Sequence, residues 1–351
     1  MVHPGVEGLR PVLRRLLPWK TRLAIDVGTA SCHISVQDAG LVVREPTVIA
    51  FETKRRRPIA YGAEAKEMLD REVSDVEVVR PLDGGVVADF DAAVLLLRHL
   101  IHQALGHRPL LAPTAVTGEP TRATQVERRA LVNALRSAGV GEVIPVPRAL
   151  AAAIGAGLPM DQPECRLVVD MGAGSTDIAV VSGGMIAAGE ALRYGGDDLD
   201  EAIRRHVKRR YRTDIGLARA EDIKIMAGAL SPEMIGEQVR LADVAGDETE
   251  DGSQRLEGIA ELMRGALKPA VGEILWVLEE LPERQVDEIS PVDCTLTGGC
   301  ALLRGITALL SEELALSFIA APDPMSCTIL GLEAISNDLD ALSLDGRRFT
   351  R

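Results

Sequence analysis

The sequence of 351 residues is poor in aromatic side chains, which make up 3% of it, although hydrophobic residues reach 46%. Its core must therefore be built from alanine, valine, leucine and isoleucine. No apolar run approaches the roughly 18 residues that a membrane-spanning helix needs. The N-terminus has charges but no unbroken apolar stretch followed by a small-residue cleavage site, which argues against a secretory signal. We expect a protein that stays inside the cell.

Paired cysteines and excess positive charge are also missing. The five cysteines form no CxxC pair, which is typical of a reduced protein without disulfides or a zinc site. A net charge of −13 argues against a nucleic-acid partner. The basic clusters at 54–57 and 204–212 are interpreted as solvated faces. The chain is too long for one ordinary core, so two lobes are expected.

An internal repeat is the most informative feature that is present. Residues 23–36 have the pattern of an apolar strand, a tight turn at Asp26-x-Gly28, and a second strand. Residues 167–180 repeat that plan around Asp170-x-Gly172. The residues before each Asp are apolar without alternation, as in a strand buried on both faces. The repeat predicts an α/β fold of two related lobes.

Further elements follow from periodicity and capping signals. Thr124 and Glu127 form a capping box that opens a helix to about residue 137. Other helices are expected over 91–104, from 147 to 157, over 197–211 and 219–226, and once or twice within 256–281. The acidic stretch 247–251 is expected to be a turn between short strands. A last strand at 294–296 leads into a glycine-rich turn at 297–301 and a helix that begins near residue 302.

The three glycine-rich turns suggest a phosphate-binding cleft. Glycine lets backbone N–H groups approach an anion closely. Asp26 and Asp170, at two strand ends, would face a Mg²⁺ ion through its waters, because Mg²⁺ gives up water reluctantly. The third turn would let a nucleoside lie against a helix start. The P-loop pattern GxxxxGK[ST] and the dinucleotide pattern GxGxxG are both absent.

In this order the three turns resemble the phosphate-1, phosphate-2 and adenosine motifs of the actin/Hsp70/sugar-kinase superfamily. The stretches 80–90, 123–130, 151–159 and 195–203 are similar to the MreB family of bacterial actins, and the resemblance runs from about 23 to about 336. It implies an actin-like, duplicated RNase H-like fold with subdomains IA, IB, IIA and IIB around a central ATP cleft. The implied division is an N-terminal extension 1–22; domain I, 23–155 plus about 325–337, with IB roughly 48–77; domain II, 156–324, with IIB roughly 195–253; and a tail, 338–351.

The resemblance also implies the site residues. ATP would be bound by the two strand-end turns, by a helical ribose-contacting pair and by the third turn, that is, by Asp26, Gly28, Thr29, Ala30, Ser31, Asp170, Gly172, Ala173, Gly174, Ser175, Thr176, Glu221, Lys224, Gly298, Gly299, Cys300 and Ala301. Asp26 and Asp170 would face the Mg²⁺.

Several positions depart from the family pattern. Ala173 and Cys300 stand where glycines are usual, Ser175 where a threonine is usual, and Ser31 where an asparagine is usual. Cys300 is expected to crowd the nucleotide and weaken its binding. Residues 147–149 read Pro-Arg-Ala where MreB proteins carry Glu-Glu-Pro.

Arg148 thus replaces the glutamate that the family uses to place the attacking water. Arginine has donors only, so hydrolysis is expected to be weak or absent, and Ser175 and Thr176 are the remaining catalytic candidates. Two alternatives stay open. The guanidinium could stabilise transition-state charge as an arginine finger does, or it could have turned to solvent.

Two segments have the character of membrane contacts. Leu9, Leu13 and Leu16 fall on one face of a short basic helix limited by prolines, as in an interfacial helix on anionic lipid. A leader without fixed structure or a misassigned start codon is the alternative. Leu110 and Leu111 lie where the resemblance implies a lipid-contacting loop; the alternative is two buried loop leucines.

The resemblance implies a cytoskeletal filament at the inner face of the cytoplasmic membrane. Its expected partners are further copies of the chain, a conventional MreB and membrane proteins of cell-wall synthesis. An Hsp70 chaperone would need a substrate-binding domain after the ATPase lobe, and a sugar kinase would need a general-base Asp in a sugar pocket. Neither class fits the stretches 80–90 and 123–130. Two functions remain open: a working ATPase whose hydrolysis turns filaments over, and a non-hydrolysing scaffold that assembles with a conventional MreB.

Overall fold

The structure is a computed structural model that describes residues 21–70, 75–106, 111–230, 256–281 and 294–344. Its framework is a pair of five-stranded sheets with the same topology. The first has the order β10-β9-β1-β2-β3 and the second the order β15-β14-β11-β12-β13. In each, the first strand pairs antiparallel with the next strand in sequence and parallel with a later one. The predicted duplication is confirmed.

The first sheet consists of β1 (Arg22–Val27), β2 (Ser31–Val36), β3 (Gly40–Pro46), β9 (Thr114–Glu119) and β10 (Glu142–Pro147). The second consists of β11 (Arg166–Met171), β12 (Thr176–Ser182), β13 (Met185–Leu192), β14 (Cys294–Thr297) and β15 (Phe318–Ala320). The apolar stretches before Asp26 and Asp170 form β1 and β11, which are almost wholly buried, as the lack of alternation predicted.

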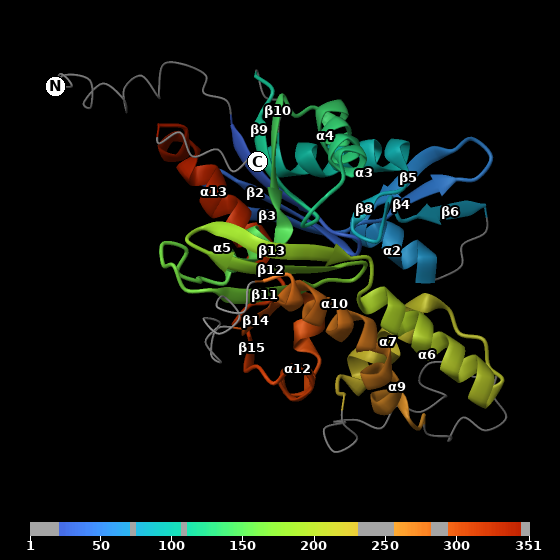
Figure 1. The fold of residues 1–351 in the computed structure, drawn as a ribbon. Coiled ribbons are helices and arrows are strands. Elements are labelled where there is room, and N and C mark those ends of the chain that lie inside the picture. The colour runs from blue at the N-terminus through green and yellow to red at the C-terminus, as the bar shows by residue number, and fades with distance from the viewer. Residues whose placement is uncertain (1–20, 71–74, 107–110, 231–255, 282–293, 345–351) are drawn as a thin grey trace, which may run out of the picture.

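Two insertions extend from the same side of this framework (Figure 1). One is a small sheet of β4 (Ile49–Glu52), β5 (Arg57–Tyr61) and β6 (Val76–Val79) with α2 (Gly62–Asp70). The other is the helical group α6 (Gly196–Tyr211), α7 (Leu217–Ala227) and α9 (Ile259–Ala266). A short hairpin, β7 (Leu82–Asp83) with β8 (Val86–Val87), follows the small sheet in the sequence and precedes β9.

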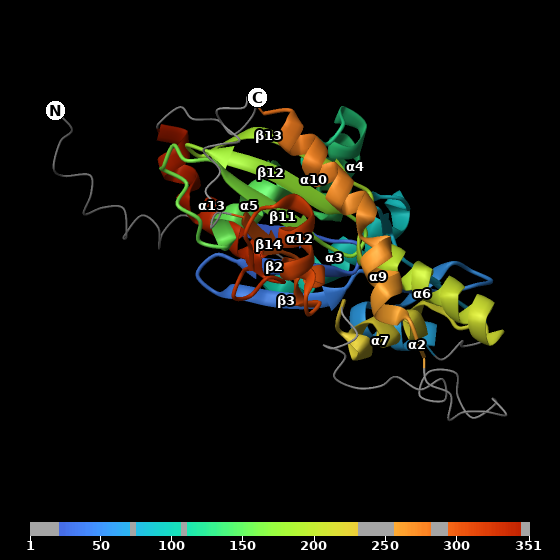
Figure 2. The ribbon, with the colours of Figure 1, turned by 60° about the horizontal axis from the view of Figure 1, so that its bottom comes forward.

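The remaining helices cover the sheets. α3 (Phe90–Leu105) and α4 (Gln125–Ala138) share a core with the first sheet, and the capping box of Thr124 and Glu127 is present. α10 (Lys268–Glu279) and α12 (Ile306–Leu314) share a core with the second sheet, and both lie over it in Figure 2. The helix expected near residue 302 begins at Ile306, because a single 3-10 turn over Gly299–Leu302 comes first. The acidic stretch 247–251 lies outside the described residues.

A third core joins the two halves. It is formed by α5 (Arg148–Gly155) and α13 (Cys327–Leu344) together with strands of both sheets. The two helices follow the last strands of their respective halves, so they are related by the duplication. They cross at two glycines: a Cβ on Gly155 would lie 1.7 Å from the carbonyl oxygen of Cys327, and one on Gly331 would lie 1.8 Å from that of Ala151. Only glycine permits so close an approach of two helix backbones.

Candidate functional site

A cleft of about 390 Å³ opens between the two halves. Its walls come from the β1–β2 turn, the start of α5, the β11–β12 turn, the start of α6, one face of α7, the turn after β14 and the start of α13. Of the seventeen residues that the sequence predicted for nucleotide binding, all except Thr176 and Ala301 line this cleft. Thr176 is buried and donates its hydroxyl to the carbonyl oxygen of Tyr194.

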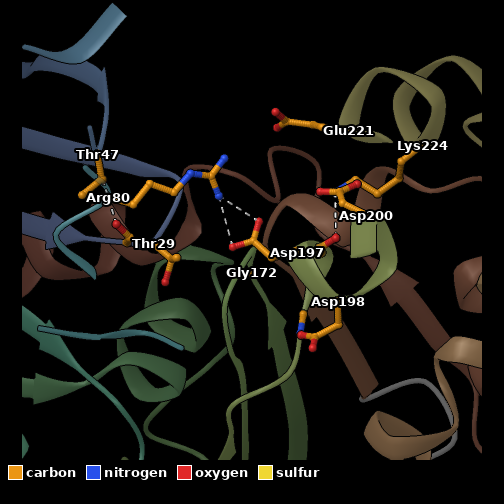
Figure 3. A network of polar contacts seen from close by, with 12 residues as sticks. Thr29, Thr47, Arg80, Gly172, Asp197, Asp198, Asp200, Glu221 and Lys224 are labelled. Carbon is orange, nitrogen blue, oxygen red and sulfur yellow. Dashed lines mark hydrogen bonds and ion pairs between the residues drawn. The ribbon is translucent and has the colours of Figure 1, made fainter. Parts of the chain in front are cut away.

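The first phosphate turn is held by its own backbone. The N–H of Gly28 donates to the carbonyl oxygen of Ser31 at 3.0 Å, and the Thr47 hydroxyl donates to the carbonyl oxygen of Gly28 at 2.8 Å (Figure 3). A Cβ on Gly28 would lie 2.8 Å from the same Ser31 oxygen. The glycine is therefore required by the tightness of the turn.

The second phosphate turn repeats this geometry. The N–H of Gly172 donates to the carbonyl oxygen of Ser175 at 2.9 Å. The two turns face each other closely, because a Cβ on Gly174 would lie 2.5 Å from the hydroxyl oxygen of Thr29. Two opposed turns of this kind can hold a polyphosphate between their backbone N–H groups.

Asp170, at the end of β11, is already hydrogen-bonded through both carboxylate oxygens. Thr297 donates to Oδ1 at 2.8 Å and Thr328 to Oδ2 at 3.2 Å. Burial, and after it the negative charge of Asp177, raises the pKa of Asp170 to about 7, although Arg148 and the Thr297 bond oppose the change. At physiological pH this carboxyl is therefore partly protonated.

Asp26, at the end of β1, has a free acceptor. Its Oδ1 is buried and has no hydrogen-bond partner among the described residues. No group of three or more metal-ligating side chains occurs in the described part of the chain. Asp26 and Asp170 therefore fit a hydrated Mg²⁺ held through water at Asp26 better than a directly coordinated ion.

Arg148 lies inside the cleft, at the first position of α5, with 6% of its surface exposed. Its Nη1 donates to Asp177 Oδ2 at 3.1 Å and to Ser175 Oγ at 3.3 Å. Burial would lower the pKa of Arg148, but the carboxylates of Asp177, Asp26 and Asp170 outweigh burial and raise it. The alternative that this side chain has turned to solvent is wrong.

The third turn begins at Gly298, whose φ of +82° and close approach to β11 both require glycine. The thiol of Cys300 is buried and donates to the carbonyl oxygen of Gly172 at 3.4 Å. It thus contacts the second phosphate turn from the adenosine side. Ile225, Leu302 and Met325 line the same end of the cleft with 65%, 58% and 47% of their surfaces exposed. Such apolar side chains, left open in a cleft, suit the faces of a flat ring.

The predicted ribose pair, Glu221 and Lys224, lies on α7 with both side chains engaged. Lys66 of α2 donates to Glu221 Oε2 at 3.0 Å across the mouth of the cleft. Lys224 donates to the carbonyl oxygen of Gly196 at 2.9 Å and to Asp200 Oδ2 at 2.8 Å (Figure 3).

Another ion pair crosses between the halves, between Arg80 Nη1 and Asp197 Oδ1 at 3.4 Å (Figure 3). Sequence reasoning missed this pair, and it missed Lys66, Asp177, Thr328 and the three apolar side chains. Asp177, Ile225 and Leu302, which adjoin motif residues, could have been found from the sequence.

The predicted membrane residues are mostly outside the described part of the chain. Outside the described residues lie Leu9, Leu13, Leu16 and Leu110. Leu111 is described and has 42% of its surface exposed. No helix in the described residues is long and apolar enough to cross a bilayer.

Two sheets of identical order, joined by crossing helices around a cleft with paired Asp-x-Gly turns, define an actin-like protein. Comparison with known proteins narrows the class. A family model described as MreB/Mbl protein matches residues 20–344. The chain is 37% identical to the cell shape-determining protein MreB of Escherichia coli strain K12 over 321 residues, which is 88% of this chain and 91% of that protein. It is 33% identical to the cell shape-determining protein Mbl of Bacillus subtilis strain 168 over 325 residues, 91% and 97% of the two chains.

Among solved structures, MreB 5 of Spiroplasma citri bound to AMPPNP superposes with a TM-score of 0.83 at 28% identity, covering 93% of this chain and 99% of that one. The chain belongs to the MreB/Mbl family. It is accordingly an actin-like cytoskeletal protein of the cell shape-determining type, and the resemblance found in its motifs is confirmed.

Proposed function

We propose that the protein binds ATP in the cleft and assembles with further copies of itself into filaments beneath the cytoplasmic membrane. The carrying observation is the pair of opposed turns, where Gly174 and Thr29 approach each other as two halves of one phosphate clamp. The AMPPNP-bound relative supports nucleotide as the ligand. The domain division given from the sequence, with domain I closed by residues near 325–337, is part of this proposal.

In this arrangement the triphosphate lies between the two turns at the Arg148 end, and the base lies among Ile225, Leu302 and Met325. Glu221 and Lys224 adjoin the base end and are suitably placed for the ribose hydroxyls. Asp26, whose Oδ1 is free to accept a hydrogen bond, would hold a hydrated Mg²⁺. The ion would offset charge on the phosphates.

Hydrolysis is proposed to be far slower than in a conventional MreB. No carboxylate at position 148 can accept a hydrogen bond from an attacking water, and arginine cannot do so. The adjacent Asp177 does not take over, because its Oδ2 is held by Arg148 and its Oδ1 accepts from the backbone N–H of Thr121 at 2.6 Å. A positioned base is commonly worth about 10²–10⁴ in rate.

The second candidate function, a scaffold that binds nucleotide without hydrolysing it and assembles with a conventional MreB, is favoured by the same burial of Arg148. A single-turnover assay with excess protein measures how much hydrolysis remains. Phosphate release is measured beside ATP binding, with Escherichia coli MreB in parallel. We expect binding with little release. Release at the rate of the parallel MreB would refute slow hydrolysis, and absence of binding would refute the proposed function.

Membrane and cell-wall partners remain part of the proposal through Leu111, which is exposed next to the predicted lipid-contacting position Leu110. One or two leucines form a weak anchor, since burying each is worth roughly 1.5–3 kcal/mol. Repetition along a filament multiplies such an anchor.

A further inference from the structure

We propose that Arg148 supplies a permanent positive charge at the phosphate end of the cleft. Nucleotide binding by this protein therefore depends only weakly on a divalent metal ion. The inference rests on the proposed nucleotide binding and assigns to Arg148 a role as a phosphate ligand. It starts from two buried polar atoms that lie close together at the phosphate end of the cleft and have no hydrogen-bond partner among the described residues.

The first atom is Nε of Arg148. It is buried and without a hydrogen-bond partner in the described residues, on a side chain with only 8% of its surface exposed. The second atom, Oδ1 of Asp26, lies 3.9 Å from it, which is too long for a hydrogen bond. A buried N–H without an acceptor is costly, so this geometry favours an acceptor that arrives with a ligand.

The guanidinium presents this atom on its open edge. Nη1 is used by Ser175 and Asp177. Nη2 makes only a long contact of 3.5 Å to the carbonyl oxygen of Val27. The protons of Nε and Nη2 point along the same edge, which is the fork that matches two oxygens of a phosphate or carboxylate. That edge faces the end of β1, where the first phosphate turn begins.

Charge in this end of the cleft supports the same conclusion. Asp26, Asp170 and Asp177 surround Arg148, and Asp26 and Asp170 line the cleft, so without Arg148 a triphosphate would meet uncompensated carboxyl groups. A divalent ion ordinarily offsets such repulsion. Arginine stays protonated at any cellular pH, so Arg148 supplies one fixed positive charge whether or not metal is present.

The carboxylates are poorly prepared for a directly bound ion. Both oxygens of Asp170 accept from hydroxyl groups. The open oxygen of Asp26 lies next to the guanidinium, where a second cation would be repelled. A hydrated ion at Asp26 can add to nucleotide binding, but Arg148 already carries part of its task.

The test is equilibrium binding of a fluorescent ATP analogue at constant ionic strength, in excess Mg²⁺ and in excess EDTA. The full-length protein is expected to bind in both, with a dissociation constant in EDTA less than about tenfold weaker than in Mg²⁺. Arg148→Gln is expected to widen that ratio by about tenfold or more, since a hydrogen bond to a charged group is worth a factor of about 10–150. Arg98→Gln is the matched control: it removes one positive charge from an exposed site on α3, where Arg98 donates to the carbonyl oxygen of Ser137.

Binding in Mg²⁺ that is lost in EDTA would overturn the inference and leave the proposed function intact. An Arg148→Gln ratio equal to that of the Arg98→Gln control would also overturn it. Absence of binding in both buffers would refute the proposed function and the inference together. Circular dichroism checks that the variant folds. If it does not, Arg148→Lys is used, which keeps the charge but loses the fork and should weaken binding in EDTA severalfold more than in Mg²⁺; equal weakening in the two buffers would contradict the assignment.

Discussion

Replacing Gly331 with alanine should destabilise the protein, although alanine is the better helix former. The substitution lies inside α13 at the crossing with α5. A Cβ there would lie 1.8 Å from the carbonyl oxygen of Ala151, whereas real Cβ atoms essentially never approach within 3.0 Å. The backbones of the two helices must therefore separate by roughly 1 Å in a core that is packed like a crystal.

The magnitude follows from two opposing effects. Overpacking of a core costs typically about 1–3 kcal/mol, and a backbone clash that no rotamer can relieve belongs at the upper end. Exchanging glycine for alanine within a helix returns about 0.5–1 kcal/mol. The net loss is about 2 kcal/mol, which for a chain of 351 residues corresponds to a melting temperature lower by roughly 3 °C.

The assay is thermal unfolding followed by circular dichroism at one fixed scan rate, with Gly272→Ala as the matched control. Gly272 is an exposed glycine inside α10, and a Cβ there would meet nothing within 4 Å. Gly272→Ala should raise the melting temperature by about 1 °C. If Gly331→Ala melts at or above the temperature of the parent, the close crossing of α5 and α13 does not exist as described.

Four further predictions concern the cleft and the membrane. Folding raises the pKa of Asp170 from 3.8 to about 7, so its contribution to stability is largest below pH 4 and is lost as the pH rises to 7. In chemical unfolding without metal, Asp170→Asn should therefore exceed the parent in free energy of unfolding by more at pH 8 than at pH 5, with a difference on the order of 2 kcal/mol. An equal excess at the two pH values would contradict this. Burial raises the pKa of Cys300 to about 12 and all five cysteines are buried, so thiol reagents at pH 8 should label the native protein very slowly, with or without nucleotide, and fast labelling would refute that burial. Replacing Cys300 with glycine is expected to tighten ATP binding, measured by titration; unchanged affinity would show that the thiol does not crowd the nucleotide. The pair Leu110→Ser and Leu111→Ser should reduce co-sedimentation of filaments with anionic liposomes severalfold, and pelleting equal to the parent would remove this loop as an anchor.

The sequence predicted the framework because duplication leaves a local signature. The strands around Asp26 and Asp170 repeat one apolar pattern, and the capping box at Thr124 marks a helix start without reference to tertiary structure. The order of strands within each sheet came only through the resemblance to a known family. Parallel pairing of β1 with β9, for example, joins residues far apart in the chain, and no local signal records it.

The candidate site divides along the same line. Residues within a motif, such as Gly28 and Gly172, could be predicted because the turn itself requires them. Lys66 and Thr328 could not be predicted, because each reaches the cleft from a distant element only after folding. Arg148 was found as a departure from a family pattern, but its burial and its pairing with Asp177 depend on where β12 lies relative to α5.

The bond between Lys66 and Glu221 has a kinetic consequence. It joins the two insertions beside the cleft, where Glu221 is the proposed ribose ligand. Nucleotide entry is then expected to compete with this pair. Both side chains are partly exposed, with 38% and 25% of their surfaces accessible, so dissolved salt weakens the pair. Ionic strength should then act twice on the association rate constant, slowing the approach of an anion while easing the opening of the mouth through which it enters.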